Sequence, residues 1–238
     1  MCYNLTNSTI LLVAMLDFSG RWYSKEIIMQ AMRLYLSYSF YRDVEEIIAE
    51  RGANIDHSTI QRWVEKYAKD LETVFTSNYR KHKTYVSWRM DETYSKVKGK
   101  RVYLYRAIDK DGDTLEFMVS DKRDEAAATK FFKKAIRSHG LPEKVTVDKS
   151  GSNEPALLHL NLRYGNWIEI RQMKFLNNRI EQDHRNIKRR TNPMMGFKSW
   201  SSAESTIAGY ELVNMLRKGQ HIHAESMTGY DQFYSLAA

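Results

Sequence analysis

The stretch YVSWRMDETY, residues 85–94, marks the point where the sequence changes from a helical to a sheet-forming pattern. Apolar and polar side chains alternate along it, which is typical of a strand with one buried face. Two further strands are expected at residues 102–108 and 114–119, and the turn at residues 110–113 (Lys-Asp-Gly-Asp) joins them. The three strands are therefore expected to form an antiparallel meander.

Strand and helix patterns alternate after the meander. In order, the expected elements are a helix at 124–137, a strand at 144–148, a helical and locally irregular connection at 153–167, a strand at 167–171, and helices at 178–190 and 203–218. A meander followed by alternating strands and helices predicts an α/β fold with a mixed five-stranded sheet and flanking helices.

Three helical patterns precede the sheet, within residues 21–80. Ser24 and Asp56 are expected N-caps, and Gly52 is placed to end the second helix. Two helices joined by a short turn predict a helix-turn-helix DNA-binding segment, and its polar residues are of types that bind phosphates or base edges. These candidate DNA contacts are Ser58, Gln61, Arg62 and Lys66. The alternative is a plain helical hairpin with a solvated polar face.

The composition narrows the classes of protein that fit. Of 238 residues, 42% are hydrophobic and 28% charged, as expected for a folded soluble protein. Lys and Arg number 37 against 29 Asp and Glu, and the net charge of +8 favours DNA or RNA as a partner. Cys2 is the only cysteine, which excludes an intrachain disulfide and a cysteine-based zinc site. The apolar run at residues 9–16 is too short to span a membrane.

Three acids stand where divalent-metal chemistry is expected. Asp91 lies within an apolar strand, Asp148 ends the fourth strand, and Glu181 lies in the first turn of the helix after the fifth strand. Two adjacent strands and a neighbouring helix can bring these carboxylates together, and Mg²⁺ or Mn²⁺ prefers such oxygen ligands. Each acid also has a local explanation: Asp91 could pair with a lysine, Asp148 could cap a turn, and Glu181 could belong to a capping box.

Ordered motifs surround these acids. They are Met90-Asp91-Glu92-Thr93-Tyr94, Val147-Asp148-Lys149-Ser150-Gly151 and the run from Asn177 to Lys188, accompanied by Asp56-His57-Ser58-Thr59-Ile60, Arg171-Gln172-Met173-Lys174 and Met195-Gly196-Phe197-Lys198. The set spans residues 18–220 and resembles the DDE transposases of bacterial insertion sequences, most closely the insertion-sequence family numbered six.

This resemblance implies a division of the chain. It places a helix-turn-helix DNA-binding domain at residues 21–80 and an RNase H-like catalytic domain at residues 81–220. Residues 1–20 are then an N-terminal extension, and residues 221–238 are a C-terminal tail.

The resemblance also implies the roles of individual residues. Asp91, Asp148 and Glu181 are assigned as catalytic ligands of two Mg²⁺ (or Mn²⁺) ions. Lys188 is assigned as a contact to the transposon end, and its helix carries the further DNA-contact candidates His184, Arg185 and Arg189.

The implied activity is DNA transposition. Such a transposase binds the terminal inverted repeats of its element and catalyses metal-dependent strand cleavage and strand transfer on double-stranded DNA. It would act as a homo-oligomer, at least a dimer, in the bacterial cytoplasm at the nucleoid, without a membrane partner. Two alternatives remain: a helix-turn-helix regulator without catalysis, and an inactive relic of a transposase. Divalent-metal binding at a single acidic site separates the enzyme from the regulator.

Overall fold

The computed structural model describes residues 16–237 except 39, 84–85, 149–150 and 166, and most of the expected N-terminal extension therefore lies outside the described residues. The N-terminal helices are α1 (Lys25–Ser37), α2 (Tyr41–Ala49) and α3 (His57–Val74), followed by the π-helical turn η1 (Phe75–Tyr79). The Ser24 side chain accepts a hydrogen bond from the N–H of Ile27, and the Asp56 side chain accepts one from the N–H of Ser58, so both predicted N-caps are confirmed.

The amphipathic pattern of the sequence explains how these helices pack. Ile60, Trp63 and Tyr67 of α3 are buried, whereas Arg62 and Lys66 are exposed. The second helix ends earlier than expected, at Ala49, and Gly52 lies in the following turn with a φ of +85°.

The sheet contains five strands in the order β3-β2-β1-β4-β5. Their bounds are β1 Ser87–Val97, β2 Lys100–Asp109, β3 Thr114–Ser120, β4 Lys144–Val147 and β5 Glu169–Gln172. β2 is antiparallel to both of its neighbours, and β1, β4 and β5 run parallel. This is the mixed five-stranded sheet that the sequence predicts.

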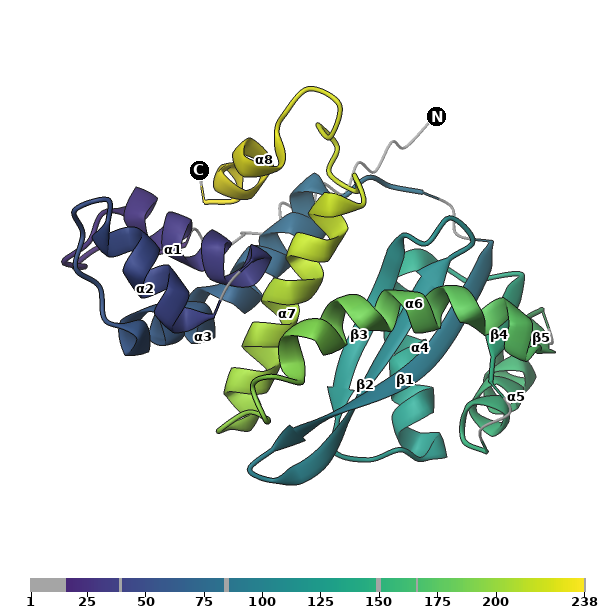
Figure 1. Ribbon diagram of the computed structural model, residues 1–238. Coiled ribbons are helices and arrows are strands. Elements are labelled where there is room, and N and C mark those ends of the chain that lie inside the picture. The colour runs from purple at the N-terminus through teal and green to yellow at the C-terminus, as the bar shows by residue number, and fades with distance from the viewer. Residues whose placement is uncertain (1–15, 39, 84–85, 149–150, 166, 238) are drawn as a thin grey trace, which may run out of the picture.

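Helices cover both faces of the sheet (Figure 1). Their bounds are α4 Glu125–His139, α5 Asn153–Tyr164, α6 Lys174–Thr191, α7 Trp200–Arg217 and α8 Gly229–Ser235. α4 and α5 share a core with Trp88 and Met90 of β1, and α6 and α7 lie on the opposite face.

The expected helix between β4 and β5 is confirmed, but the expected local irregularity is not found within residues 153–164. This segment is a regular helix, because Pro155 lies in its first turn, where a missing N–H breaks no helical hydrogen bond. α6 begins at Lys174, four residues before the expected start at residue 178.

One hydrophobic core joins the N-terminal helices to the sheet. α7 packs along α3 and against α1, and Gly209 makes the close approach possible. A Cβ at Gly209 would lie 2.6 Å from a methyl group of Leu36 and 3.1 Å from the Cβ of Ala68. The C-terminal residues also dock here, because Phe233 of α8 and Leu236 are buried in the same core.

Among the described helices, none combines the length and the apolar character that a membrane span requires.

Candidate active site

Two of the predicted catalytic acids meet where the carboxyl end of β4 lies beside the middle of the parallel strand β1. Asp91 lies within β1, and Asp148 follows the last residue of β4. Arg89 of β1 pairs with Thr146 of β4, so the same register extended by two residues brings Asp91 beside Asp148. One carboxylate oxygen from each of Asp91, Glu92 and Asp148 lies within 4.8 Å of the others.

The third acid comes from the helix above these strands. Glu181 is an exposed residue of α6, which packs against β1 and β4. Because α6 starts at Lys174, Glu181 lies in the second helical turn instead of the first. The N-cap is Met173, without a side-chain cap, so the capping-box explanation of Glu181 was wrong.

The electrostatics of the site reflect this crowding of acids. Burial raises the pKa of Asp91 to about 7, and the charges of Glu92, Asp148 and Glu181 add to the rise against one stabilising backbone N–H. Each of these carboxylates therefore makes ionisation of Asp91 less favourable. A divalent cation bound between them would remove the repulsion, since carboxylate oxygens suit a hard ion.

Glu92 is a fourth acid that the sequence analysis missed. Its side chain is 1% exposed, its Oε2 lies 3.4 Å from Arg123, and its Oε1 is buried without a hydrogen-bond partner among the described residues. Arg123 also lies 3.9 Å from Asp148. Because side chains alternate along a strand, Glu92 is expected to face away from Asp91. Its position directly after Asp91 in the sequence was therefore the only signal that placed it near the site. The orphaned oxygen and the all-oxygen donor set fit a divalent metal ion.

A second cluster of charges lies beside the acids and is fully paired. Arg106 of β2 is completely buried, and it pairs in register with Asp91 of β1. Its guanidinium binds Glu211 of α7 at 2.5 Å and Asp183 of α6 at 2.6 Å. Lys218 binds Asp183 at 2.8 Å from the other side. We call Arg106, Asp183, Glu211 and Lys218 the buried charge cluster.

The buried charge cluster fixes the helix that carries Glu181. Burial alone would raise the pKa of Asp183, but the charges of Arg106 and Lys218 hold this pKa below its ordinary value. Asp183 is two residues beyond Glu181 on α6, so its ion pairs hold this part of the helix against β2 and α7.

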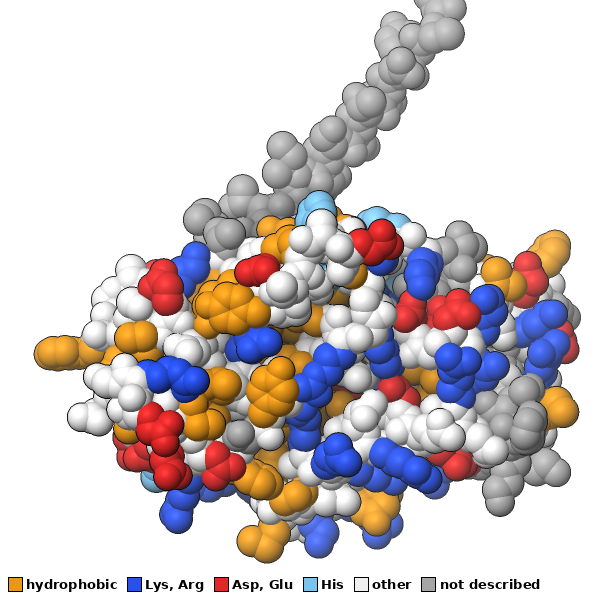
Figure 2. All heavy atoms as spheres, turned by 45° about the horizontal axis from the view of Figure 1, so that its top comes forward, with side chains coloured by type: hydrophobic (Ala, Val, Ile, Leu, Met, Phe, Trp, Pro, Cys, Tyr) orange, Lys and Arg blue, Asp and Glu red, His pale blue; other side chains and the backbone are white. Residues whose placement is uncertain are grey.

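The predicted DNA contacts on α6 differ in accessibility. Arg185 and Arg189 are exposed, and Lys188 is half-buried with its Nζ 5.9 Å from the ring centre of Tyr94. Figure 2 shows Lys and Arg side chains in a band across the middle of this side of the molecule.

His184 does not share this exposure. It is 2% exposed, and burial together with the charges of Arg106 and Lys188 lowers its pKa to about 3. Because the ring is neutral and buried, it is not accessible to DNA, and we do not expect His184 to be a DNA contact.

The predicted contacts on α3 form a second basic surface. Arg62 donates to the carbonyl of Ser58 at 3.2 Å and to Thr59 Oγ1 at 3.0 Å, and Gln61 donates to Glu65 at 2.9 Å. A cavity of about 740 Å³ opens beside them. Its lining residues are Gly20, Arg21, Trp22, Tyr23, Thr59, Arg62, Trp63 and Lys66. Ser58 and Lys66 are exposed, so three of the four candidates reach solvent.

Comparisons with known proteins identify the family of this chain. Residues 85–220 match the family model of a transposase DDE domain. The chain is 39% identical over 203 residues to the transposase for insertion sequence-like element IS431mec of Staphylococcus aureus, covering 84% of this chain and 88% of the relative. It is equally similar to the transposase for insertion sequence element IS257 in transposon Tn4003 of the same species.

Solved structures of viral integrases are more distant. The HTLV-2 integrase catalytic core domain in complex with magnesium matches with a TM-score of 0.44 and 16% identity, over 63% of this chain and 96% of that one. The catalytic core domain of BIV integrase matches with a TM-score of 0.43 and 17% identity, over 63% and 94%. The family model and the curated relatives place this chain in the DDE transposase family of insertion sequences.

Proposed function

We propose that this protein cleaves DNA at the ends of an insertion sequence and joins the freed ends to target DNA. The observation that carries the proposal is the meeting of Asp91 of β1 and Asp148 at the end of β4, with the Glu181 charge acting on Asp91, in a DDE-family chain. Asp91, Asp148 and Glu181 would hold two Mg²⁺ or Mn²⁺ ions through their carboxylate oxygens. The ions, when bound, activate the attacking oxygen and stabilise the leaving oxygen.

The chain contributes positions and charge rather than a nucleophile. In the first step a water oxygen bonds to phosphorus as the bond to the 3′-oxygen breaks, which leaves a 3′-hydroxyl on the element and a 5′-phosphate on the flank. In the second step the oxygen of this hydroxyl bonds in line to a phosphorus of the target as the bond from that phosphorus to the target's own 3′-oxygen breaks, which leaves a 3′-hydroxyl on the target strand. The buried charge cluster keeps Glu181 in place during both steps, because Asp183 anchors the same helix.

Two basic surfaces hold the DNA. The exposed face of α3, with Ser58, Gln61, Arg62 and Lys66, binds the terminal repeat as the recognition helix of the domain at residues 21–80. Lys188, Arg185 and Arg189 of α6 position the cleaved end beside the acids of the domain at residues 81–220. A homo-oligomer, at least a dimer, pairs the two ends of the element.

Cleavage of labelled duplexes that carry the element's end tests the proposal. Asp91→Asn, Asp148→Asn and Glu181→Gln should each reduce Mg²⁺-dependent cleavage by about 10³-fold or more, because several kcal/mol of charge stabilisation is lost. Binding to the same duplex should change little, since affinity comes from basic residues. The exposed Glu225→Gln is the matched control.

Two outcomes contradict the proposal. Near wild-type cleavage by one of the three variants removes that residue from the site. Specific binding to the end without any Mg²⁺-dependent cleavage by the wild-type chain supports the regulator or the inactive relic instead.

Sequence recognition by α3 is tested separately. Arg62→Ala should weaken binding to the element's own terminal repeat by about 1–3 kcal/mol and binding to random duplex much less. Lys25→Ala, on α1, is the control. Equal weakening on both duplexes means that α3 contacts only phosphates.

A further inference from the structure

The outer face of α4 carries a stripe of cations. Lys130, Lys133, Lys134 and Arg137 are spaced i, i+3, i+4 and i+7, which places them on one side of a helix. The opposite side of α4, with Phe131, Phe132 and three alanines, is buried against the sheet. We call these four residues the α4 stripe.

The positive charges of the α4 stripe repel one another in the isolated protein. The α4 stripe contains four like-charge pairs at helical spacings of three or four residues, where side chains are neighbours and like charges repel each other. Lys134 is compensated, because it lies 2.9 Å from Glu116 of β3. Lys130, Lys133 and Arg137 are exposed and make no ion pair with the described part of the chain. A polyanion would remove this repulsion.

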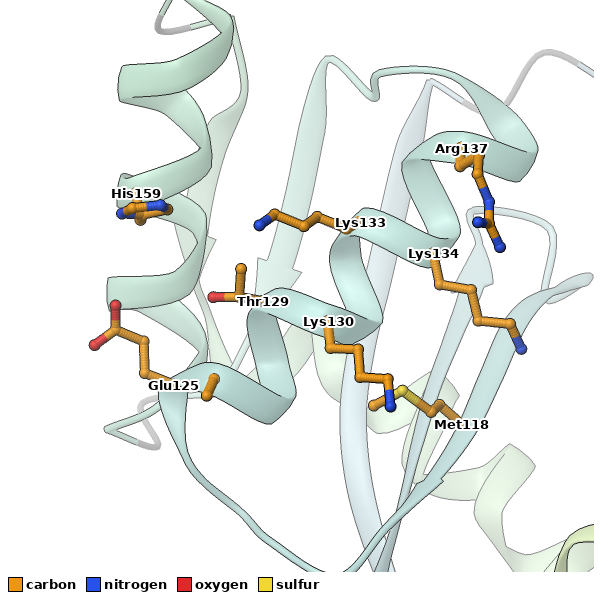
Figure 3. A pocket seen from close by; sticks show the side chains of 9 residues that line it. Met118, Glu125, Thr129, Lys130, Lys133, Lys134, Arg137 and His159 are labelled. Atoms are coloured by element: carbon orange, nitrogen blue, oxygen red, sulfur yellow. The ribbon is translucent and has the colours of Figure 1, made fainter.

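The α4 stripe also lines a surface cavity that is open to the sugar-phosphate backbone of DNA. A cavity of about 870 Å³ lies over α4, with Met118 of β3 and His159 of α5 in its lining. Lys133 extends toward His159, and Lys130 and Lys134 extend toward β3 (Figure 3). A second cavity of about 750 Å³ shares Lys134 and Arg137 and adds further basic side chains. These are Lys69, Arg80, Lys81, His82 and Lys83, alongside the acids Glu72 and Glu116.

The dimensions of the stripe match a DNA strand. Seven residues of helix rise about 10.5 Å, and one DNA strand presents a phosphate about every 3.4 Å along the helix axis. The four cations therefore cover about three phosphate steps. Lysines contact phosphates as flexible point charges, so this surface is suited to duplex DNA of any sequence.

The position of α4 distinguishes this surface from the active site. Arg123, two residues before α4, lies beside Glu92 and Asp148, so the helix begins at the catalytic edge of the sheet. From there α4 runs along the face opposite to α6 (Figure 1). DNA on the α4 stripe is therefore a segment beyond the one that Lys188 and the catalytic acids contact.

We propose that the α4 stripe binds the phosphate backbone of a duplex segment that lies outside the catalytic site. The proposal rests on the proposed function for the identity of the DNA. The segment comes either from the DNA that flanks the element or from the target duplex, and both present the same phosphates.

Salt-dependent binding tests the α4 stripe without any catalysis. The triple variant Lys130→Ala, Lys133→Ala, Arg137→Ala is titrated with a random 60-base-pair duplex at several salt concentrations in the absence of metal. Each lost phosphate contact lowers the slope of log K against log salt by about 0.9, so we expect a decrease of about 2–3 and an affinity at least tenfold lower. The matched control, which removes three exposed cations outside residues 21–80 and outside the α4 stripe, is Lys96→Ala, Lys100→Ala, Lys110→Ala.

A milder variant guards against misfolding. Lys133→Gln, Arg137→Gln changes only exposed side chains, and circular dichroism and thermal unfolding verify its fold. We expect a slope decrease of about 1–2 for this variant. An unchanged slope in either folded variant, or an equal decrease in the control, overturns the proposal.

Activity assays then separate the two sources of the segment. If the stripe holds flanking DNA, the triple variant cleaves long uncleaved substrates at least tenfold more slowly but transfers pre-cleaved short ends normally. If it holds target DNA, transfer of pre-cleaved ends falls and cleavage does not. A wild-type chain that cleaves no DNA but shows the slope difference contradicts the proposed function and leaves the α4 stripe supported.

Discussion

Two groups of charged side chains lie side by side on the same face of the sheet, and they differ in the sign of the charges that surround them. Asp91 and Arg106 are direct partners across β1 and β2, and directly opposed residues point to the same face. Around Arg106, each buried charge meets one of opposite sign. Around Asp91, the neighbouring groups named for its pKa shift are acids.

The difference separates structural charge from functional charge. A buried ion pair need not add net stability, but an uncompensated buried charge is costly. The buried charge cluster satisfies this condition within the chain. The charges that act on Asp91 are instead those of other acids, so this carboxylate is suited to a cation from solution. The following predictions test that contrast.

The largest effect is expected from breaking the buried charge cluster at its centre. Arg106→Met leaves Glu211 buried without its cation and should lower the free energy of unfolding by about 3–5 kcal/mol. Lys100→Met, exposed on the same strand, should change it by less than about 0.5 kcal/mol. Urea unfolding followed by circular dichroism measures both.

The same experiment can be sharpened with a compensating change. Arg106→Met combined with Glu211→Leu removes both members of the pair and should recover more than half of the loss. A double variant as unstable as the single one contradicts the idea that charge imbalance, rather than lost packing, causes the effect.

A smaller effect is expected from the acids. Mg²⁺ at about 100 times its dissociation constant should stabilise the wild-type chain by about 2.7 kcal/mol. Asp91→Asn should lose most of this stabilisation, because the central ligand is gone. Thermal unfolding with and without Mg²⁺ measures the difference, and Asp231→Asn, an exposed residue of the C-terminal helix, is the control. Equal Mg²⁺ stabilisation in Asp91→Asn would mean that the ion binds elsewhere.

The pH dependence of stability distinguishes the two groups further. The pKa of Asp91 is about 7 in the folded chain and lower when unfolded, so without metal its contribution to stability is lost as pH rises from about 4 to 7. Glu72 changes in the same direction, because burial raises its pKa to about 7. His139 and His184, with pKa values lowered mainly by burial to about 4 and 3, reduce stability as pH falls below about 6.5.

The contribution of Asp91 is isolated by subtraction. The difference in unfolding free energy between the wild type and Asp91→Asn, measured without metal from pH 4 to 8, should change in favour of the variant as pH rises. With saturating Mg²⁺ the trend should reverse, because the ion favours the ionised acid. A difference that is independent of pH contradicts the raised pKa of Asp91.

The smallest effect is expected at the edge of the buried charge cluster. Lys218→Met removes one of two cations from Asp183, which keeps its ion pair with Arg106. We expect a loss of about 1–2 kcal/mol, well below that of Arg106→Met. A loss as large as that of Arg106→Met would mean that the cluster acts as a single unit.

The sequence predicted the sheet because alternation is a local signal. The five-stranded mixed sheet and both N-caps follow from patterns within about ten residues. Around Pro155 the sequence predicted a helical connection but with a local irregularity, whereas the helix is regular, since position within the first turn decides whether proline is tolerated.

The three candidate catalytic acids and the buried charge cluster also differ in how far the sequence predicts them. The three acids lie in motifs that identify the family, so they were named in advance. The partners of Arg106 depend on folding over long distances, because Glu211 is 105 residues away. Nothing local marks Asp183 as structural, and strand alternation directs attention away from Glu92.

The close packing of α7 along α3 has a consequence for synthesis of the chain on the ribosome. α3 ends at Val74, and α7 is complete only at Arg217. Bacterial and eukaryotic ribosomes add about 5–20 residues per second, so the N-terminal helices wait about 7–30 s for the helix that buries them. During that interval α7 does not yet cover the apolar side chains of α1 and α3 that later pack around Gly209, so these side chains face solvent. A nascent chain therefore completes the packing of its N-terminal helices only after Asp91, Asp148 and Glu181 have been synthesised.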